Sequence, residues 1–244
     1  IRFASKLNLK IHPDTEKPIK DYSNLLADIP SARLYEEIIK LFLNGCAAET
    51  FILLRKHNLF KYLFPQMDQL LDENQKNNSY KFIMRALNNT DQRINKGDSA
   101  TPGFLLAAML WEPVRILSNE YISNNLSEVE AIKLAGDAII SKQISSTSMP
   151  RRYTYMARDI WALQVRLKRT TKKPLRVLMH PKFRAAYDFL LLRAQSDESL
   201  ENLVDYWTKE QLDEPLVGKG KQKKSGNRRH SSHRRIRNSR KKDL

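Results

Sequence analysis

The sequence of 244 residues contains few of the residues that tight turns and disulfide bonds require. Glycine occurs only 7 times, well below its usual share of about 7%, so few positions suit the positive φ angles of hairpin turns. An all-β fold is therefore disfavoured. The single cysteine, Cys46, can form neither an internal disulfide nor a cysteine-based metal site. Such sparing use of cysteine is typical of a reducing compartment.

Long apolar runs are also missing. No segment approaches the roughly 18 to 20 consecutive apolar residues of a membrane span, and no basic leader precedes a short apolar core. We therefore expect a soluble, cytoplasmic protein with no membrane partner. The first residue is Ile1 rather than Met, which indicates a processed product or a fragment of a longer protein.

Positive charge is abundant and unevenly distributed. The chain has 43 Lys and Arg against 27 Asp and Glu, a formal net charge of +16. Residues 1–150 are nearly balanced, with 18 basic and 17 acidic side chains, and residues 185–217 are acidic, with two basic and eight acidic. Residues 151–184 carry 11 basic side chains against Asp159 alone, and residues 218–244 carry 12 against Asp243 alone. This pattern favours nucleic acid as the partner.

The segment 218–244 has no aromatic residue and few large aliphatic ones. It cannot bury enough apolar surface to offset its chain entropy, so we predict a disordered basic tail. A solubilising terminus and a targeting signal are alternative interpretations. We favour binding to nucleic acid by counterion release, which adds affinity without sequence choice.

Apolar residues recur with helical period through the rest of the chain, and no segment of useful length alternates as a strand does. We therefore predict an all-α fold, as a bundle or a stacked array. The segments predicted to be helical are 32–43, 47–57, 62–73, 79–89, 103–117, 127–143, 155–168, 181–194 and 200–212.

Motifs for catalysis or metal binding are not found. Two-metal nucleotidyl transfer needs clustered carboxylates on a rigid element, whereas Asp14 and Glu16 flank Thr15 in what we predict to be a loop bounded by prolines. The five histidines form no HExxH motif, and there is no glycine-rich phosphate loop. We therefore predict no catalytic and no metal-binding residue in this chain.

The segment 149–173 mixes arginines with aromatic residues, as single-strand binding requires: cations neutralise phosphates and flat rings stack on bases. The alternative is an ordinary helix whose buried stripe contains Ile160, Trp161, Leu163 and Leu167 and whose arginines only face solvent. We favour the core for Trp161 and RNA for the cations. The predicted RNA-binding residues, including those of the next segment and of the tail, are Arg151, Arg152, Tyr153, Arg158, Arg166, Lys168, Arg169, Lys172, Lys173, Lys182, Arg184, Arg228, Arg229, Arg234 and Arg235.

Four stretches share motifs with one known family. They are residues 1–7 (IRFASKL), 25–45 (LLADIPSARLYEEIIKLFLNG), 150–163 (PRRYTYMARDIWAL) and 180–193 (HPKFRAAYDFLLLR). Residues 1–7 are similar to the end of a Leu-Arg-Ala-x-Arg-Phe-x-x-Lys-Leu motif, and residues 25–45 to a neck helix. Together the stretches resemble the C-terminal two thirds of bacterial poly(A) polymerases, which are class II nucleotidyltransferases.

The neck helix of that family carries a Glu-Arg-x-x-x-Glu element. Arg33 corresponds to its Arg and Glu37 to its final acid, but Ala32 replaces the first Glu. This departure favours poly(A) polymerases over CCA-adding enzymes, which usually keep the Glu. The resemblance implies that Arg33, Glu37 and Arg2 support the nucleotide pocket; the alternative for Arg33 and Glu37 is an intrahelical ion pair worth about 0.2 to 0.5 kcal/mol.

The resemblance implies four parts: a remnant of the head (1–20), a helical neck (21–90), a helical RNA-binding body (91–217) and the basic tail (218–244). The family adds AMP from ATP to RNA 3′ ends, using Mg²⁺ held by carboxylates of the head. We therefore expect Mg²⁺ and ATP for the full-length enzyme, no cofactor in this chain, and binding of single-stranded RNA 3′ ends with weak sequence preference. A fragment of a CCA-adding tRNA nucleotidyltransferase and a stand-alone helical RNA-binding protein remain alternatives.

Overall fold

The computed structural model describes residues 1–71, 78–170 and 174–213, and the predicted tail lies outside these residues. Throughout the described ranges the regular secondary structure is helical, without a strand, which confirms the all-α prediction. Among the same residues no helix has the length and apolar character that crossing a membrane would take. In chain order the elements are α1 (Arg2–Leu7), α2 (Pro13–Asp21), η1 (Ser23–Asp28), α3 (Ser31–Phe42), α4 (Ala47–Lys56), α5 (Phe60–Leu63), α6 (Pro65–Asp68), α7 (Asn78–Asn95), α8 (Pro102–Met109), α9 (Trp111–Ser123), α10 (Glu128–Ser146), α11 (Arg151–Leu167), α12 (Leu175–Leu178), α13 (Phe183–Ala194), η2 (Glu198–Leu200) and α14 (Glu201–Asp213).

Helix α3 follows its sequence pattern closely. Leu34, Ile38, Leu41 and Phe42 are buried on one side, as their spacing of three and four residues predicts. The chain then turns at Gly45, whose φ of 87° is easily adopted only by glycine. The turn lets α4 begin at Ala47 and pack back against α3.

Two of the predicted helices are interrupted by proline. The predicted helix 62–73 is instead the short helices α5 and α6, because Pro65 holds the preceding Phe64 at φ −137° and ψ 67°, outside the helical region. The predicted helix 103–117 is divided into α8 and α9 at Leu110. Pro113 cannot donate a hydrogen bond to the carbonyl of Met109, so a continuous helix is broken there.

The predicted loop around Asp14 and Glu16 is also wrong, since both residues lie in α2. Pro13 occupies the first helical position, where the missing N–H costs nothing, and the His12 side chain accepts a hydrogen bond from the backbone N–H of Asp14. Glu16 then reaches α4, where its carboxylate lies 2.7 Å from Lys56 Nζ.

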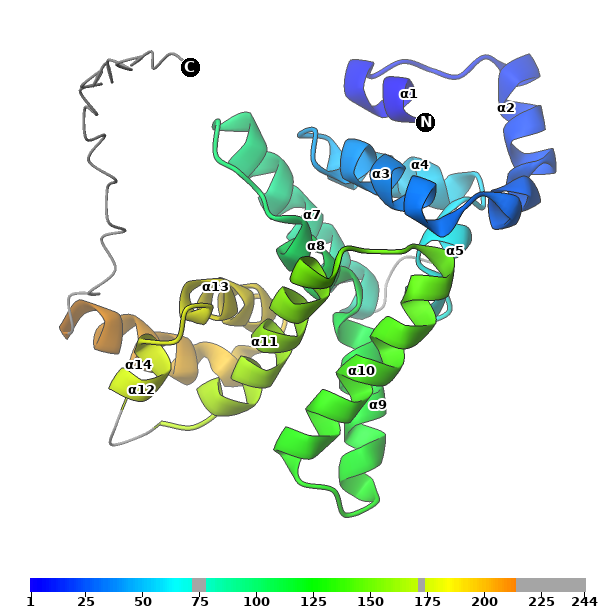
Figure 1. Cartoon of the computed structure of the whole chain (residues 1–244). Coiled ribbons are helices and arrows are strands. Elements are labelled where there is room, and N and C mark those ends of the chain that lie inside the picture. The colour runs from blue at the N-terminus through cyan, green and yellow to red at the C-terminus, as the bar shows by residue number, and fades with distance from the viewer. Residues whose placement is uncertain (72–77, 171–173, 214–244) are drawn as a thin grey trace, which may run out of the picture.

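Helix α11 lies at the centre of the fold and packs against α8, α10 and α13 (Figure 1). Close approach is possible because glycines face it. A Cβ on Gly103 of α8 would meet the Met156 side chain, and one on Gly136 of α10 would lie 3.1 Å from the Trp161 ring. Trp161 is buried and donates its indole N–H to the Ala107 carbonyl over 3.0 Å, which confirms its predicted place in the core.

Two clusters of buried side chains form the interior. The larger runs from Leu34 in α3 to Leu192 in α13, and thus continues across the proposed boundary between neck and body at residue 90. The smaller gathers around Trp207 of α14, with residues from α11, α12 and α13. Helices α11 and α13 contribute to both clusters and so hold the C-terminal helices to the rest. The four-part division by residue number remains a prediction.

Candidate nucleic-acid interface

The two sides of α11 differ sharply. Ile160, Trp161, Leu163 and Leu167 are buried, as the helical spacing predicted. At about 100° per residue, a set of long polar and aromatic side chains falls on the opposite side, where Asp159 is the one acidic residue of the helix. We call this set the outer stripe: Arg151, Arg152, Tyr155, Arg158 and Arg166.

At the N-terminal end of α11, arginine and tyrosine side chains meet helix α3. The Arg152 guanidinium lies 4.6 Å from the centre of the Tyr153 ring and donates a hydrogen bond to its hydroxyl over 3.0 Å. The Tyr153 ring in turn lies 6.4 Å from that of Tyr35. Burial raises the pKa of Tyr35. Arg151 is exposed and, among the described residues, has no carboxylate partner within ion-pair distance.

In the middle of the outer stripe, Arg158 is engaged by the neighbouring helix. Its Nε donates to Asp137 of α10 over 2.5 Å, and its guanidinium lies 5.7 Å from the Tyr155 ring centre. Tyr155 is 56% exposed, which leaves its ring accessible to a base. Tyr155 is thus a better stacking candidate than Tyr153, which is half-buried and whose ring contacts both Arg152 and Tyr35.

At the C-terminal end, the predicted cations are tied to other elements. Lys168 Nζ lies 3.1 Å and Arg169 Nη2 3.9 Å from the carboxylate of Glu128, at the start of α10. Arg166 donates to the backbone carbonyl of Arg176 over 3.3 Å. Because α11 rises about 1.5 Å per residue, this end lies about 25 Å from Arg151. The predicted residues therefore form a track along the helix rather than one cluster.

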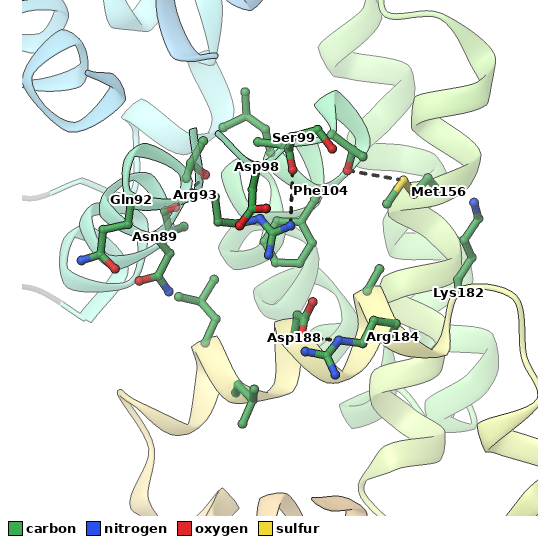
Figure 2. Close-up of a pocket in the computed structure, with 18 of the residues that line it drawn as sticks. Asn89, Gln92, Arg93, Asp98, Ser99, Phe104, Met156, Lys182, Arg184 and Asp188 are labelled. Carbon is green, nitrogen blue, oxygen red and sulfur yellow. Dashed lines mark hydrogen bonds and ion pairs between the residues drawn. The ribbon is translucent and has the colours of Figure 1, made fainter. Parts of the chain in front are cut away.

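Lys182 and Arg184 lie elsewhere, at the start of α13, where they line a cavity of about 620 Å³ (Figure 2). Arg184 Nε is 3.1 Å from Asp188 Oδ1, one helical turn further along α13. Burial raises the pKa of the Asp188 carboxyl, while the nearby Arg184 and Arg93 oppose that rise. The other predicted cations Lys172, Lys173, Arg228, Arg229, Arg234 and Arg235 lie outside the described residues.

The cavity is a groove between α7 and α13, with the start of α8 and Met156 of α11 between them. Figure 2 shows α7 side chains on one side and Arg184 and Asp188 of α13 on the other. We call it the α7–α13 groove. Its lining residues are Ala86, Asn89, Thr90, Gln92, Arg93, Lys96, Asp98, Ser99, Ala100, Thr101, Phe104, Leu105, Met156, Pro181, Lys182, Arg184, Ala185, Asp188, Leu191, Leu192 and Gln195.

The helices of both walls, α7 and α13, are held by partly buried polar contacts. On α7, the Asp91 carboxylate accepts the backbone N–H groups of Ala47 over 2.6 Å and Ala48 over 3.0 Å, and so caps α4. On α13, Arg193 donates to Gln164 Oε1 over 3.0 Å and lies over the Trp111 ring at 4.8 Å. Burial lowers the pKa of Arg193 to about 10.

The three residues predicted to support the nucleotide pocket are only partly brought together. Arg2 Nη1 lies 3.6 Å from the Glu37 carboxylate, and Lys40 Nζ lies 2.7 Å from it. The hydrogen bond from Lys40 is the main cause that lowers the pKa of Glu37. Arg33 is exposed one turn away. Glu37 therefore pairs with Arg2 and Lys40 in place of the intrahelical Arg33 pair considered from the sequence.

No three His, Cys, Asp or Glu side chains gather as a metal ion would require within residues 1–71, 78–170 and 174–213. Two of the acidic residues are engaged elsewhere: Glu37 pairs with Arg2 and Lys40, and Asp91 accepts backbone N–H groups of α4. These residues do not fit the Mg²⁺ site that the family resemblance implies for the full-length enzyme. We therefore assign no role in Mg²⁺ or ATP binding to the described residues.

The α7 wall of the groove was not predicted from the sequence. Asn89, Gln92, Arg93 and Lys96 follow one another at intervals of three, one and three residues, which places them on one side of a helix. The sequence shows this spacing. However, the predicted helix ended at residue 89, whereas α7 continues to Asn95. Only the packing of α13 opposite α7 shows that this side faces a cavity.

Two family models match this chain. A family model described as "Probable RNA and SrmB- binding site of polymerase A" matches residues 8–71, and one described as "Polymerase A arginine-rich C-terminus" matches residues 124–242. Poly(A) polymerase I of Salmonella typhi and that of Escherichia coli O6:H1 are each 39% identical over 224 residues, 90% of this chain and 48% of theirs. Poly(A) polymerase I of Haemophilus influenzae is 38% identical over 214 residues, 85% of this chain and 46% of its own.

The regular secondary structure of the described residues is thus helical, one helix has a basic face, and two polymerase A family models match the chain. The chain belongs to the poly(A) polymerase family, as its motifs indicated, and it spans about half the length of the curated relatives it matches. The resemblance to poly(A) polymerases inferred from residues 1–7, 25–45, 150–163 and 180–193 is thereby confirmed, but the chain corresponds to about half of these relatives rather than to the two thirds expected from its motifs.

Proposed function

We propose that this chain is the RNA-holding portion of a polyadenylating enzyme, in which it binds single-stranded RNA 3′ ends while the catalytic head adds AMP from ATP with Mg²⁺. The observation that carries the proposal is the outer stripe of α11, together with the net positive charge of residues 151–184. Solubility alone does not require 11 basic side chains against a single acidic one over residues 151–184.

The outer stripe supplies both ingredients of single-strand binding. Exposed Arg151 and Arg152 are placed to neutralise phosphates, and the exposed Tyr155 ring offers a stacking surface. Neither interaction selects a base strongly, so the proposed binding has weak sequence preference. The basic segment 218–244, which lies outside the described residues, would add electrostatic affinity of the same unselective kind.

The cluster of Arg2, Glu37 and Lys40 supports a second part of the proposal. It joins α1 to the neck helix α3, on the element that the resemblance assigns to the nucleotide pocket. We propose that Arg2 and Glu37 position this pocket's wall, with exposed Arg33 beside them. The "SrmB-binding" half of the family description, matched by residues 8–71, makes the neck a candidate surface for a protein partner in the cytoplasm.

The experiment measures binding of the full chain to an oligo(A) strand and to a mixed-sequence strand by fluorescence anisotropy, over a range of salt concentrations. We expect similar affinities for the two strands, and a log–log salt slope of about −0.7 for each phosphate contact. A chain that binds neither strand at low salt would show that the outer stripe is only a solvated helix face.

A parallel assay tests the division of labour. The purified chain, supplied with ATP, Mg²⁺ and an RNA primer, should transfer no AMP, because the described residues gather no carboxylates for two-metal chemistry. Clear Mg²⁺-dependent primer extension by the pure chain would overturn this part of the proposal.

A further inference from the structure

We infer that the α7–α13 groove is a second RNA subsite, which takes up one or two nucleotides of a single strand with their bases toward its floor. The inference rests on the proposed RNA-binding function and adds a site to it. Phe104, Leu105 and Met156 form the apolar part of the lining, and polar and cationic side chains from α7 and α13 stand on either side. At about 620 Å³ the groove is within the usual range for ligand pockets, about 300 to 1,000 Å³.

The walls carry the groups that bind nucleotides. From α7 come the amides of Asn89 and Gln92, which can hydrogen-bond to base edges, and the cation Arg93, and from the turn directly after α7 comes Lys96. From α13 and the turn before it come Arg184 and Lys182 (Figure 2). A ligand with flat apolar faces, polar edges and negative charge fits this combination, and a nucleotide of a single strand has all three.

The acidic side chains of the groove do not cancel its charge. Asp98 and Asp188 face four cations, namely Arg93, Lys96, Lys182 and Arg184. Asp188 is already paired with Arg184 at 3.1 Å and is close enough to Arg93 to be stabilised by it. The remaining positive charge on both walls is available to phosphates.

The groove reaches α11 at Met156, close to the outer stripe. Met156, which lines the groove, lies one helical turn after Arg152, and residues four apart share one side of a helix. Met156 also contacts Thr101 at the mouth, where Sδ and Oγ1 are 3.9 Å apart. A strand that follows the outer stripe therefore meets the groove beside Arg152.

The first test reverses charge on the α7 wall of the full chain with Arg93→Glu and Lys96→Glu together. Both side chains are exposed, so the fold should survive, and circular dichroism checks it. We expect oligo(A) affinity to fall about ten-fold at 0.1 M salt and the salt slope to flatten by about 1.4, at about 0.7 for each lost phosphate contact. The matched control, Lys133→Glu with Lys142→Glu, changes the same charge on exposed positions of α10 and should cost less than about two-fold.

The second test separates bases from phosphates. Phe104→Leu keeps the groove apolar but removes its aromatic ring, and we expect about a five-fold loss of affinity for oligo(A), the lower end of what stacking on one ring contributes. An abasic strand of equal length should bind the variant and the unaltered chain equally. Thermal unfolding of the variant shows whether the core contact with Phe189 has been kept.

The outcomes are distinct. If the unaltered chain binds RNA while the Arg93/Lys96 variant matches its α10 control, the groove is no RNA subsite although the proposed function stands. If the abasic strand loses as much affinity as oligo(A) on Phe104→Leu, bases do not enter the groove. Displacement of RNA by an oligoglutamate of equal length from the unaltered chain but not from the Arg93/Lys96 variant would assign the groove to acidic peptides. If the unaltered chain binds no RNA, the proposed function fails and the subsite with it.

Discussion

Residues 8–71 and the basic segment, residues 151–184, are built from similar amphipathic helices but differ in the balance of their charges. We call residues 8–71, the first part of the neck together with the preceding helix α2, the neck region. The neck has eight basic and eight acidic side chains, whereas the basic segment has 11 and one. Within the neck the ions pair among themselves: Lys56 with Glu16 at 2.7 Å, and Lys40 with Glu37 at 2.7 Å. Some of the described cations of the basic segment form ion pairs, and their partners are individual carboxylates of α10 and α13.

The part of the chain matched by an RNA-binding family description and the part with the excess positive charge are therefore different. The description that mentions RNA matches the balanced neck, while the excess charge lies in the region matched by the arginine-rich family model. Tyr35 and Tyr153 bring the two regions into contact at the N-terminal end of α11. RNA bound along α11 would therefore reach the neck without the neck supplying the charge.

The largest expected effect comes from matched charge reversals in the two regions. Arg151→Glu with Arg152→Glu should weaken oligo(A) binding about 30-fold at 0.1 M salt, near 2 kcal/mol, because two phosphate contacts are lost. Lys17→Glu with Lys20→Glu, on exposed positions of α2, should cost no more than about two-fold. Anisotropy titrations measure the oligo(A) affinity of both variants, and equal losses of affinity would show that the two regions do not differ in RNA binding.

The next effect tests the joint between the neck and the α7 wall of the groove. Gly45→Ala should lower the free energy of unfolding by about 1 to 2 kcal/mol, because φ is 87° and the new Cβ would clash with Asn95 Oδ1. Gly97→Ala is the control, since its φ of 85° is similar but no atom lies within 4 Å. Urea unfolding should rank Gly45→Ala below Gly97→Ala, and the reverse order would show that the contact with Asn95 does not matter.

A smaller effect concerns pH and belongs to the neck alone. His57 is buried and neither ring nitrogen has a hydrogen-bond partner among the described residues; burial lowers its pKa, against the attraction of Glu16. The unfolded chain therefore takes up a proton below about pH 6.5 that the folded chain resists. Stability should be fully present above that pH and fall as the pH drops below it, by at most about 1.4 kcal/mol per pH unit.

Urea unfolding at several pH values between 5 and 7.5 measures this loss. His57→Leu should flatten the dependence, while His180→Gln, at a half-buried position before α13, should leave it in place. An unchanged slope in the His57 variant would assign the titration to other groups.

The smallest effect probes the partner of the C-terminal cations of α11. Glu128→Gln releases Lys168 and Arg169, which lie 3.1 and 3.9 Å from its carboxylate. Affinity for oligo(A) should rise about two- to three-fold, in keeping with the modest strength of surface ion pairs. Glu120→Gln, exposed on α9, makes the same change in net charge and should alter affinity less; an equal rise would mean that only net charge counts.

Local pattern predicted the helices well where a segment carried its own start and stop signals. Helix α3 lies within a residue of its predicted range, and Leu34 and Ile38 are buried as their spacing required. The errors lie at prolines. Pro65 and Pro113 each divided a segment whose apolar period continued, while Pro13 began a helix where a loop was predicted. Position within the first turn decides whether proline favours or breaks a helix.

For the candidate site, the residue pattern was enough to predict that an amphipathic, arginine-rich helix buries Trp161 and exposes Arg151 and Arg152, because helical period and charge are local properties. Which cations pair with carboxylates, such as Arg158 with Asp137, depends on how the helices pack, as does the common groove that Arg93 and Arg184 line. These contacts join residues of different helices, and the residue period of one helix does not specify how that helix packs against another.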